Sequence, residues 1–200
     1  MHFFTISYNI KNAKKMKKRR LLFILLSLIL LSSTFVYAEE AGIDGVNITR
    51  EGDLQVSFNV INVFTGEVEE AIASGIPTSF TFTVELHRKR GLWFDRTVVK
   101  RRFMHTVKYD TLREEYSVTL EEKGPAAVAT KDSAAMQTLM ANVDALHLLP
   151  MEKLNRGEKY RISIRAEGDA VHLPFPLNRL LFFVSFGSFK TGWHLEEFLY

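Results

Sequence analysis

Apolar and polar residues alternate most regularly between residues 77 and 116, and this stretch dominates the expected fold. Its first arm alternates apolar Phe80, Phe82, Val84 and Leu86 with polar Thr81, Thr83, Glu85 and His87. A period of two places one face of a strand in a core and the other in water. Gly91 and Asp110 mark turns. The stretch is therefore predicted to be a meander, with a return strand from Trp93 to Tyr109 and a third strand from Glu115.

A second strand pair is predicted nearer the amino end. Residues 43–48 are followed by a turn at Gly52, and residues 54–60 then alternate between apolar and polar side chains. Residues 65–75 predict a short helix, because Thr65 is a good N-cap, acidic residues occupy the first turn and Gly75 can end the helix.

A longer helix is predicted after the meander. Asp132 or Ser133 can cap it, and Pro150 can close it. Its apolar positions recur at helical spacing: Met136, Leu139, Met140, Val143 and Leu146. Residues 160–165 and 193–199 alternate again and predict two further strands. Together these elements predict a mainly β fold (α+β), an antiparallel β-sandwich of about seven strands with one main helix packed on it.

Residues 1–38 are predicted to be a signal peptide. Lys and Arg at positions 14–20 precede an apolar run from Leu21 to Leu31, which is shorter than the roughly 20 residues of a membrane-spanning helix. Cleavage after Ala38 would export residues 39–200 to the periplasm as a single β-rich domain.

Two alternatives remain for the amino end. Residues 32–35 can extend the apolar run, so an uncleaved signal would anchor the chain in the inner membrane. Met16 precedes a further basic cluster and is an alternative start to Met1. The chain has no Cys, so neither disulfides nor a lipid-modified Cys is expected.

Lys and Arg concentrate in the predicted hairpin. Residues 39–200 contain 19 basic and 23 acidic side chains, which is a net charge of −4, yet residues 87–108 hold eight basic side chains against Asp95 alone. Such a segment would attract an acidic protein, an anionic lipid or a polyanion. The candidate binding residues are Arg88, Lys89, Arg90, Arg96, Lys100 and Arg102. The alternative is a solvated strand face whose charges discourage edge pairing. Nucleic acid is not an expected partner, because no aromatic side chains are interleaved with these charges.

A second candidate surface lies near the carboxyl end. Residues 180–186 are almost entirely apolar, and Phe182, Phe183 and Phe186 would form a patch for a membrane surface or a partner. The alternative is a strand or helix buried on both sides.

The sequence offers little support for catalysis. It has no Gly-x-Ser-x-Gly elbow, no phosphate-binding Gly loop, no Cys nucleophile and no His at metal-ligand spacing, so no catalytic residue, metal or cofactor is predicted. A hairpin turning near Gly91 places His87 opposite Thr97 rather than His105. An enzyme with an unrecognised site would need His87, Asp95 and His105 to converge in one cleft.

Several segments together resemble a known family. They are Ala73-Ser-Gly-Ile-Pro, Phe80-Thr-Phe-Thr-Val-Glu-Leu, Tyr109-Asp-Thr-Leu-Arg-Glu-Glu-Tyr, the capped helix near Asp132, Tyr160 and Leu173-Pro-Phe-Pro-Leu. The chain is similar in these segments to small exported proteobacterial proteins of a domain-of-unknown-function family (DUF4390-like). The resemblance implies a gene often found beside a nitrogen-regulation-type sensor kinase, and hence an accessory to signalling in the bacterial envelope. It assigns no role to any residue.

Three functional hypotheses follow. The first is a non-enzymatic periplasmic binding or accessory protein whose partner is an envelope protein such as a membrane sensor kinase, with peripheral membrane contact as a further option. The second is a carrier of a small ligand or lipid in a pocket between the sheets. The third is an enzyme.

Overall fold

The meander predicted for residues 77–116 is present as three antiparallel strands. The structure is a computed structural model that describes residues 40–91, 94–169 and 188–200. β3 (Thr78–Arg88) pairs with β4 (Arg96–Asp110) over its whole length, and β4 pairs in turn with β5 (Glu115–Leu120). The alternating apolar residues of β3 all face the core: Phe80, Phe82, Val84 and Leu86 are each at most 1% exposed.

These strands form the centre of a seven-stranded sheet. Its order is β10-β8-β3-β4-β5-β6, and β9 pairs with β8. The added strands are β6 (Ala127–Thr130), β8 (Lys159–Asp169), β9 (Phe189–Lys190) and β10 (His194–Leu199). The strands predicted for residues 160–165 and 193–199 are therefore confirmed as β8 and β10.

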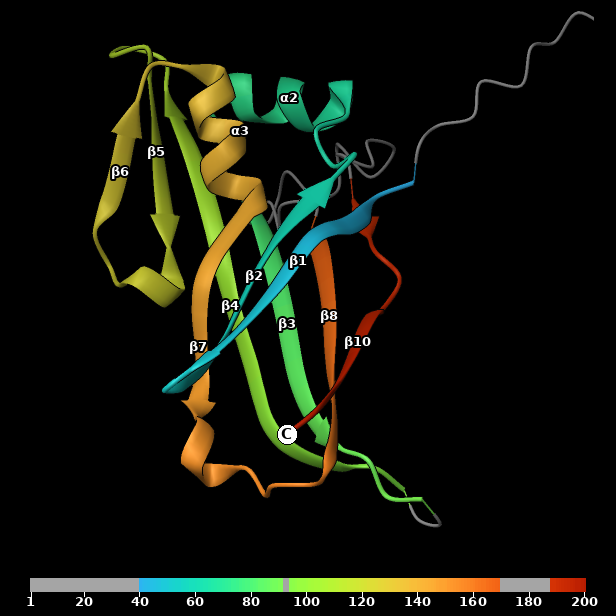
Figure 1. Cartoon of the computed structure of the whole chain (residues 1–200). Helices are drawn as coiled ribbons and strands as arrows, with labels where there is room; N and C mark the ends of the chain where they lie inside the picture. Colours follow the sequence, from blue (N-terminus) through green and yellow to red (C-terminus); the bar gives the residue numbers. More distant parts are fainter. Residues whose placement is uncertain (1–39, 92–93, 170–187) are drawn as a thin grey trace, which may run out of the picture. The chain divides into compact units, whose positions relative to one another are not determined.

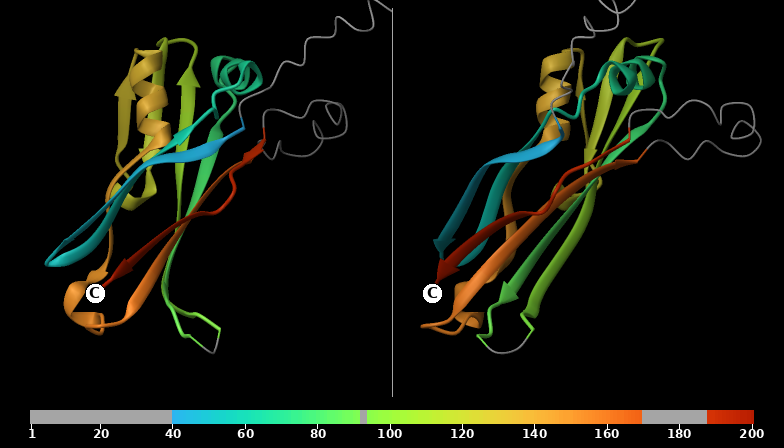
Figure 2. Two further views of the ribbon diagram at one scale, coloured as in Figure 1. Left: turned by 45° about the vertical axis from the view of Figure 1, so that its right-hand side comes forward. Right: turned by 90° about the vertical axis from the view of Figure 1, so that its right-hand side faces the viewer.

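A three-stranded sheet packs against one face of the larger sheet (Figures 1 and 2). It consists of β1 (Gly42–Glu51), β2 (Asp53–Ile61) and β7 (Asn142–Pro150), in the order β1-β2-β7. Side chains from both sheets meet in the core, as where the rings of Phe58 on β2 and Phe82 on β3 lie 6.0 Å apart, edge to face. The prediction of a mainly antiparallel β-sandwich is confirmed.

Two α-helices lie at the end of the sandwich opposite the β3–β4 turn (Figure 1). In α2 (Gly66–Ala73) the Thr65 hydroxyl accepts a hydrogen bond from Val68 N, as expected for an N-cap. In α3 (Ser133–Ala141) Asp132 plays the same part. Short 3₁₀ turns, η1 (Glu121–Lys123) and η2 (Met151–Lys153), follow β5 and β7. Within the described residues, neither α-helix has the length and hydropathy to cross a bilayer.

The prediction that the helix after Asp132 continues to Pro150 is wrong. The helix ends at Ala141 and the chain continues as β7. Val143 and Leu146 are both buried although they lie three residues apart, because β7 bulges between them, with Ala145 at φ 50°. The bulge therefore produces the spacing that was interpreted as helical.

Three strands were not predicted, so the described residues contain ten strands instead of about seven. β6 and β9 are only four and two residues long, and β7 was assigned to the helix. The described residues from 40 onward form one compact unit by their contacts. The predicted signal peptide and the Leu173-Pro-Phe-Pro-Leu segment of the family resemblance lie outside the described residues.

Candidate partner-binding surface

The β3–β4 hairpin carries most of the candidate residues, and its register places them. His87 lies opposite Thr97, as predicted, and its Nδ1 is 3.2 Å from the Thr97 hydroxyl. The turn is closed by a hydrogen bond from Arg90 N to Asp95 Oδ1 at 3.4 Å. Val98 has no partner residue on β3, because the register shifts there. The hairpin tip is thereby held at the end of the sandwich away from the helices (Figure 1).

Three of the six candidate cations are engaged within the chain. Lys89 Nζ lies 2.7 Å from Glu197 on β10, and Lys100 Nζ lies 2.7 Å from Glu85 on β3. Arg88 is 4.0 Å from Glu158. Glu197 and Glu85 lie on other strands of the same sheet and Glu158 directly precedes β8, so contacts within the chain neutralise this half of the basic cluster.

Ion pairs also shift the titration of the acidic partners. The hydrogen bond from Lys100 lowers the pKa of Glu85, and those from Lys89 and Arg161 lower the pKa of Glu197. Arg161 on β8 also pairs with Asp95 at 3.0 Å. The only acidic side chain of the basic segment is therefore engaged by an arginine from another strand. Glu85 and Glu197 therefore remain ionised at neutral pH, which favours the pairs.

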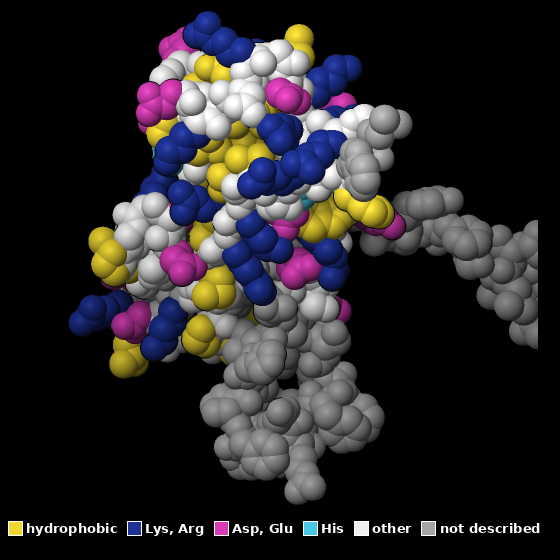
Figure 3. Space-filling view, turned by 90° about the horizontal axis from the view of Figure 1, so that it is seen from below, with side chains coloured by type: hydrophobic (Ala, Val, Ile, Leu, Met, Phe, Trp, Pro, Cys, Tyr) yellow, Lys and Arg dark blue, Asp and Glu magenta, His cyan; other side chains and the backbone are white. Residues whose placement is uncertain are grey.

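The other three candidates are exposed and form no ion pair with any residue that the structure describes. They are Arg90, Arg96 and Arg102. Arg101, which the sequence analysis counted as charge but not as a candidate, is also exposed and forms none. Figure 3 views the molecule from the hairpin end and shows Lys and Arg side chains spread across this face. We call Arg96, Arg101 and Arg102 the edge arginines, because all three lie on β4 beside its unpaired edge.

The edge of β4 is open over its first half. β5 pairs with β4 only from His105 to Asp110, so residues 96–104 have β3 on one side and none of the described strands on the other. At the boundary, Met104 N donates a 2.8 Å hydrogen bond to Glu121 Oε2 of η1. A carboxylate thus satisfies the first backbone donor beyond the end of β5.

A hollow of about 360 Å³ lies beside this open edge. We call it the edge hollow, and its lining residues come from β4, η1 and β7: Arg101, Arg102, Phe103, Glu121, Glu122, Leu146 and His147. β7 is itself the last strand of the smaller sheet. The hollow therefore lies where an edge strand of each sheet meets the turn that follows β5.

A buried pair of ionisable groups holds this turn. His105 is fully buried, its Nδ1 lies 3.1 Å from the Met140 carbonyl of α3, and its Nε2 lies 3.1 Å from Glu122 Oε2. Burial lowers the pKa of His105, and the Glu122 carboxylate acts in the opposite direction. The Glu122 side chain is 8% exposed, and its Oε1 has no hydrogen-bond partner in the described structure.

Sequence reasoning missed this pair. The available signal was that His105 shares the strand parity of Phe103 and Val107, both of which face the core. The three residues that an enzyme would have required do not converge. His87 lies on the solvent face of the sheet beside Glu85, His105 faces the core, and Asp95 pairs with Arg161. Among the described residues, no three His, Asp or Glu are placed to hold a metal ion.

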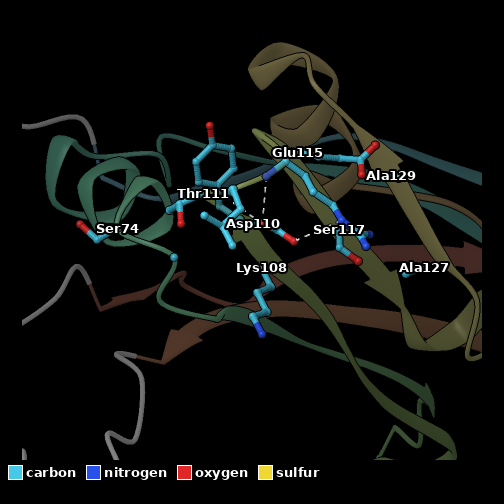
Figure 4. A pocket seen from close by; sticks show the side chains of 12 residues that line it. Ser74, Lys108, Asp110, Thr111, Glu115, Ser117, Ala127 and Ala129 are labelled. Carbon is cyan, nitrogen blue, oxygen red and sulfur yellow. Dashed lines mark hydrogen bonds and ion pairs between the residues drawn. The ribbon is translucent and has the colours of Figure 1, made fainter.

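A larger hollow, of about 740 Å³, lies at the β4–β5 turn (Figure 4). Its polar groups mostly build that turn: Asp110 Oδ1 accepts hydrogen bonds from Leu112 N and Arg113 N, and these bonds lower the pKa of Asp110. Small side chains such as Ala127 and Ala129 also line it. Size alone therefore does not make it a site.

The second candidate surface, Phe182, Phe183 and Phe186, lies outside the described residues. Other large apolar side chains are exposed nearby in the sequence. Trp193, Leu195 and Leu199 point to solvent, whereas their neighbour Phe198 packs on Tyr160 of β8 with 5.7 Å between ring centroids. Arg165 lies over the Trp193 ring at 5.4 Å from its centroid.

Comparison with known proteins gives one match. A family model described as a domain of unknown function (DUF4390) matches residues 38–196. No curated protein matches the chain, and no solved structure does.

Proposed function

Because the chain belongs to the DUF4390 family of domains of unknown function, we infer its role from its own surface, and we propose a non-enzymatic binding protein. In this proposal, the β3–β4 hairpin holds an acidic partner in the bacterial envelope. The observation that supports it is the division of the basic cluster into cations that are paired within the chain and cations that are not.

The edge arginines suit this role for physical reasons. Each is exposed, and the three lie within seven residues of one strand. A guanidinium can hold a carboxylate by two parallel hydrogen bonds, and it keeps its charge at any physiological pH. Salt screens exposed charges beyond about 8 Å at physiological ionic strength, so nearby unpaired charges dominate the electrostatic potential at this edge. The cations that are paired within the chain contribute less to it.

The proposed location is the periplasm, and the proposed partner is an acidic segment of a membrane sensor kinase. The basic and apolar leader within residues 1–38 supports export. The resemblance described above supports a signalling partner, because it implies a gene placed beside a sensor kinase. The protein would act as an accessory to that receptor.

The observed packing does not favour a carrier. A carrier would need Phe rings that line an open pocket between the sheets, but Phe80 and Phe82 are at most 1% exposed. Phe80 packs at 4.8 Å on Phe189, and Phe82 stacks at 5.3 Å on Phe103. The two hollows described above open at the surface, and neither is lined by Phe80 or Phe82.

Crosslinking in intact cells tests the proposal. A photoreactive amino acid placed at Arg96 or Arg102 should capture one membrane protein reproducibly, identified by mass spectrometry. The same probe at Thr119, on the outer face of β5, should capture little. If both positions capture the same mixture, or neither captures a protein, the hairpin is not a partner-binding surface.

Charge variants give a matched control. One variant changes the three edge arginines to Ser, and the other changes Arg88, Lys89 and Lys100 to Ser, so each loses three positive charges. The edge variant should reduce partner capture at least tenfold and the paired variant by less than threefold. Equal losses would show that only the net charge of the hairpin matters.

A further inference from the structure

We propose that the partner binds as an added β-strand on the open edge of β4. The occupant is an extended acidic segment that continues the large sheet beside β4 and places one side chain in the edge hollow. This inference rests on the proposed function for the acidic character of the partner. It adds the backbone conformation of the partner and the way in which it is recognised.

The first argument is the unused hydrogen-bonding capacity of β4. Alternate residues of a strand point their N–H and C=O groups to the same side. Met104 N points to the open side, where Glu121 binds it, so Arg102 and Lys100 present their backbone groups to the same edge. An extended chain can satisfy such groups by adding a strand, a common mode of peptide recognition.

The length of the edge fits a short peptide. Residues 96–104 are not paired by β5, and a strand rises about 3.3 Å per residue, which allows roughly 30 Å of contact. The bulge at Val98 interrupts the regular register near the hairpin tip. Regular pairing is therefore expected over residues 99–103.

Charge selects an acidic occupant. Side chains directly opposite each other on paired strands lie about 5 Å apart and interact. Arg102 is on the solvent face of the sheet and Arg101 is on the face toward the hollow, because successive side chains alternate. Carboxylates on both faces of the added strand would therefore meet an arginine.

The hollow gives the occupant a second recognition element. Glu122 is more than nine-tenths buried, lines the hollow and has an oxygen with no hydrogen-bond partner in the described structure. A buried acceptor without a donor is costly. A side chain bearing a hydroxyl or amide donor suits the part of the hollow beside Glu122, whereas carboxylates suit the positions opposite Arg101 and Arg102, which line the same hollow. This predicts a polar uncharged residue at one position among the acidic ones.

A second copy of this chain is a poor occupant of the same edge. Pairing β4 with β4 would bring the arginines of both copies onto neighbouring strands, and like charges opposite each other destabilise a sheet. Charged side chains along an edge also prevent self-association in other β proteins. The same charges that exclude a copy attract an acidic strand.

The test uses the full chain, purified as cells process it, and a defined probe. The probe is a ten-residue peptide of alternating Glu and Thr with blocked ends, and the control peptide is methylated on every backbone nitrogen. Both carry the same carboxylates, but only the probe has backbone donors. The probe should bind at least tenfold more tightly, and it should slow hydrogen exchange at the Lys100 and Arg102 amides at least tenfold.

Two variants of the protein test the backbone hydrogen bonds of β4 directly. Arg102→Pro and Arg102→Ser both remove the guanidinium, but only the proline also removes the N–H that faces the open edge. The proline variant should bind the probe at least fivefold more weakly than the serine variant. Near-UV circular dichroism shows whether each variant keeps the native packing, and the peptide comparison does not depend on either variant folding.

Three results would overturn the inference. They are equal affinity for both peptides, no binding of the probe, or bound probe without slowed exchange at Lys100 and Arg102. A self-associated chain crosslinked between Cys residues introduced by Arg102→Cys would overturn it as well, because the chain has no native Cys. If crosslinking from Arg96 to a membrane protein persists in any of these cases, the basic surface binds its partner by charge and the proposed function stands.

Discussion

Replacing His105 by Phe should destabilise the protein strongly, and the loss should be largely restored by a second change at Glu122. The Phe ring can occupy the same place, because His105 already packs against Phe82 and Phe103 with centroids 4.6 and 5.8 Å apart. The substitution therefore tests hydrogen bonding and charge more than packing. It removes both ring nitrogens, so the Met140 carbonyl and the Glu122 carboxyl group each lose their hydrogen-bond partner.

The magnitude follows from the burial of these groups. Removing one partner of a buried ionisable pair costs about 3–5 kcal/mol, because the remaining group is left desolvated and unpaired. Glu122 is 8% exposed, so a value of about 4 kcal/mol is expected for His105→Phe. Near 160 residues, 1 kcal/mol corresponds to about 2–4 °C in Tm, which predicts a decrease of about 8–16 °C.

The double variant His105→Phe, Glu122→Leu removes both members of the pair. Only the Met140 carbonyl at the end of α3 then lacks its donor, at a cost of about 1–2 kcal/mol. The double variant should accordingly be about 2–3 kcal/mol more stable than the single variant. Urea unfolding at pH 7 measures this difference, with equal slopes required for the comparison. A double variant less stable than His105→Phe would refute the reasoning.

Two further predictions concern the same molecule. The unfolding free energy should fall as the pH falls from 7 to 5, because burial lowers the pKa of His105 and the unfolded chain then takes up a proton that the folded chain does not. Urea unfolding at both pH values measures this fall, which should be smaller in the double variant His105→Phe, Glu122→Leu. A fall of the same size in the double variant would contradict the prediction. Ala145→Gly should raise the unfolding free energy by about 0.5–1 kcal/mol, because Ala145 has φ 50° and glycine adopts this conformation without a steric penalty. A lower Tm for this variant would show that the positive φ at residue 145 does not strain the folded chain.

The fold could be predicted where the apolar pattern is local and regular. Residues 80–86 alternate without a break, and the structure buries each predicted residue. β7 could not be found in the same way, because its bulge gives Val143 and Leu146 a three-residue spacing that is typical of helices. The two interpretations are separated only by the pairing of β7 with β2, which is a contact between distant parts of the chain.

The candidate surface shows a similar limit. The sequence reveals the number of cations in the hairpin but not their partners, since Glu197 lies more than one hundred residues from Lys89. Pairing within the chain engages three of the six candidates and leaves Arg90 in the turn and Arg96 and Arg102 beside the open edge. Arg101 was counted as charge but not chosen as a candidate, although it is exposed on β4 and forms no ion pair with a described residue.

The turn after β5 links the buried pair to the open edge. β5 ends at Leu120, opposite His105, and the next two residues are used differently. Glu121 binds the backbone of Met104 at the start of the unpaired edge, whereas Glu122 enters the interior and pairs with His105. Because the two are adjacent, the turn that buries Glu122 also places Glu121 against Met104, where the pairing of β4 with β5 has ended. In the proposed complex, the His105–Glu122 pair would therefore contribute more than stability, because the turn that it holds ends next to the arginine-bearing half of β4.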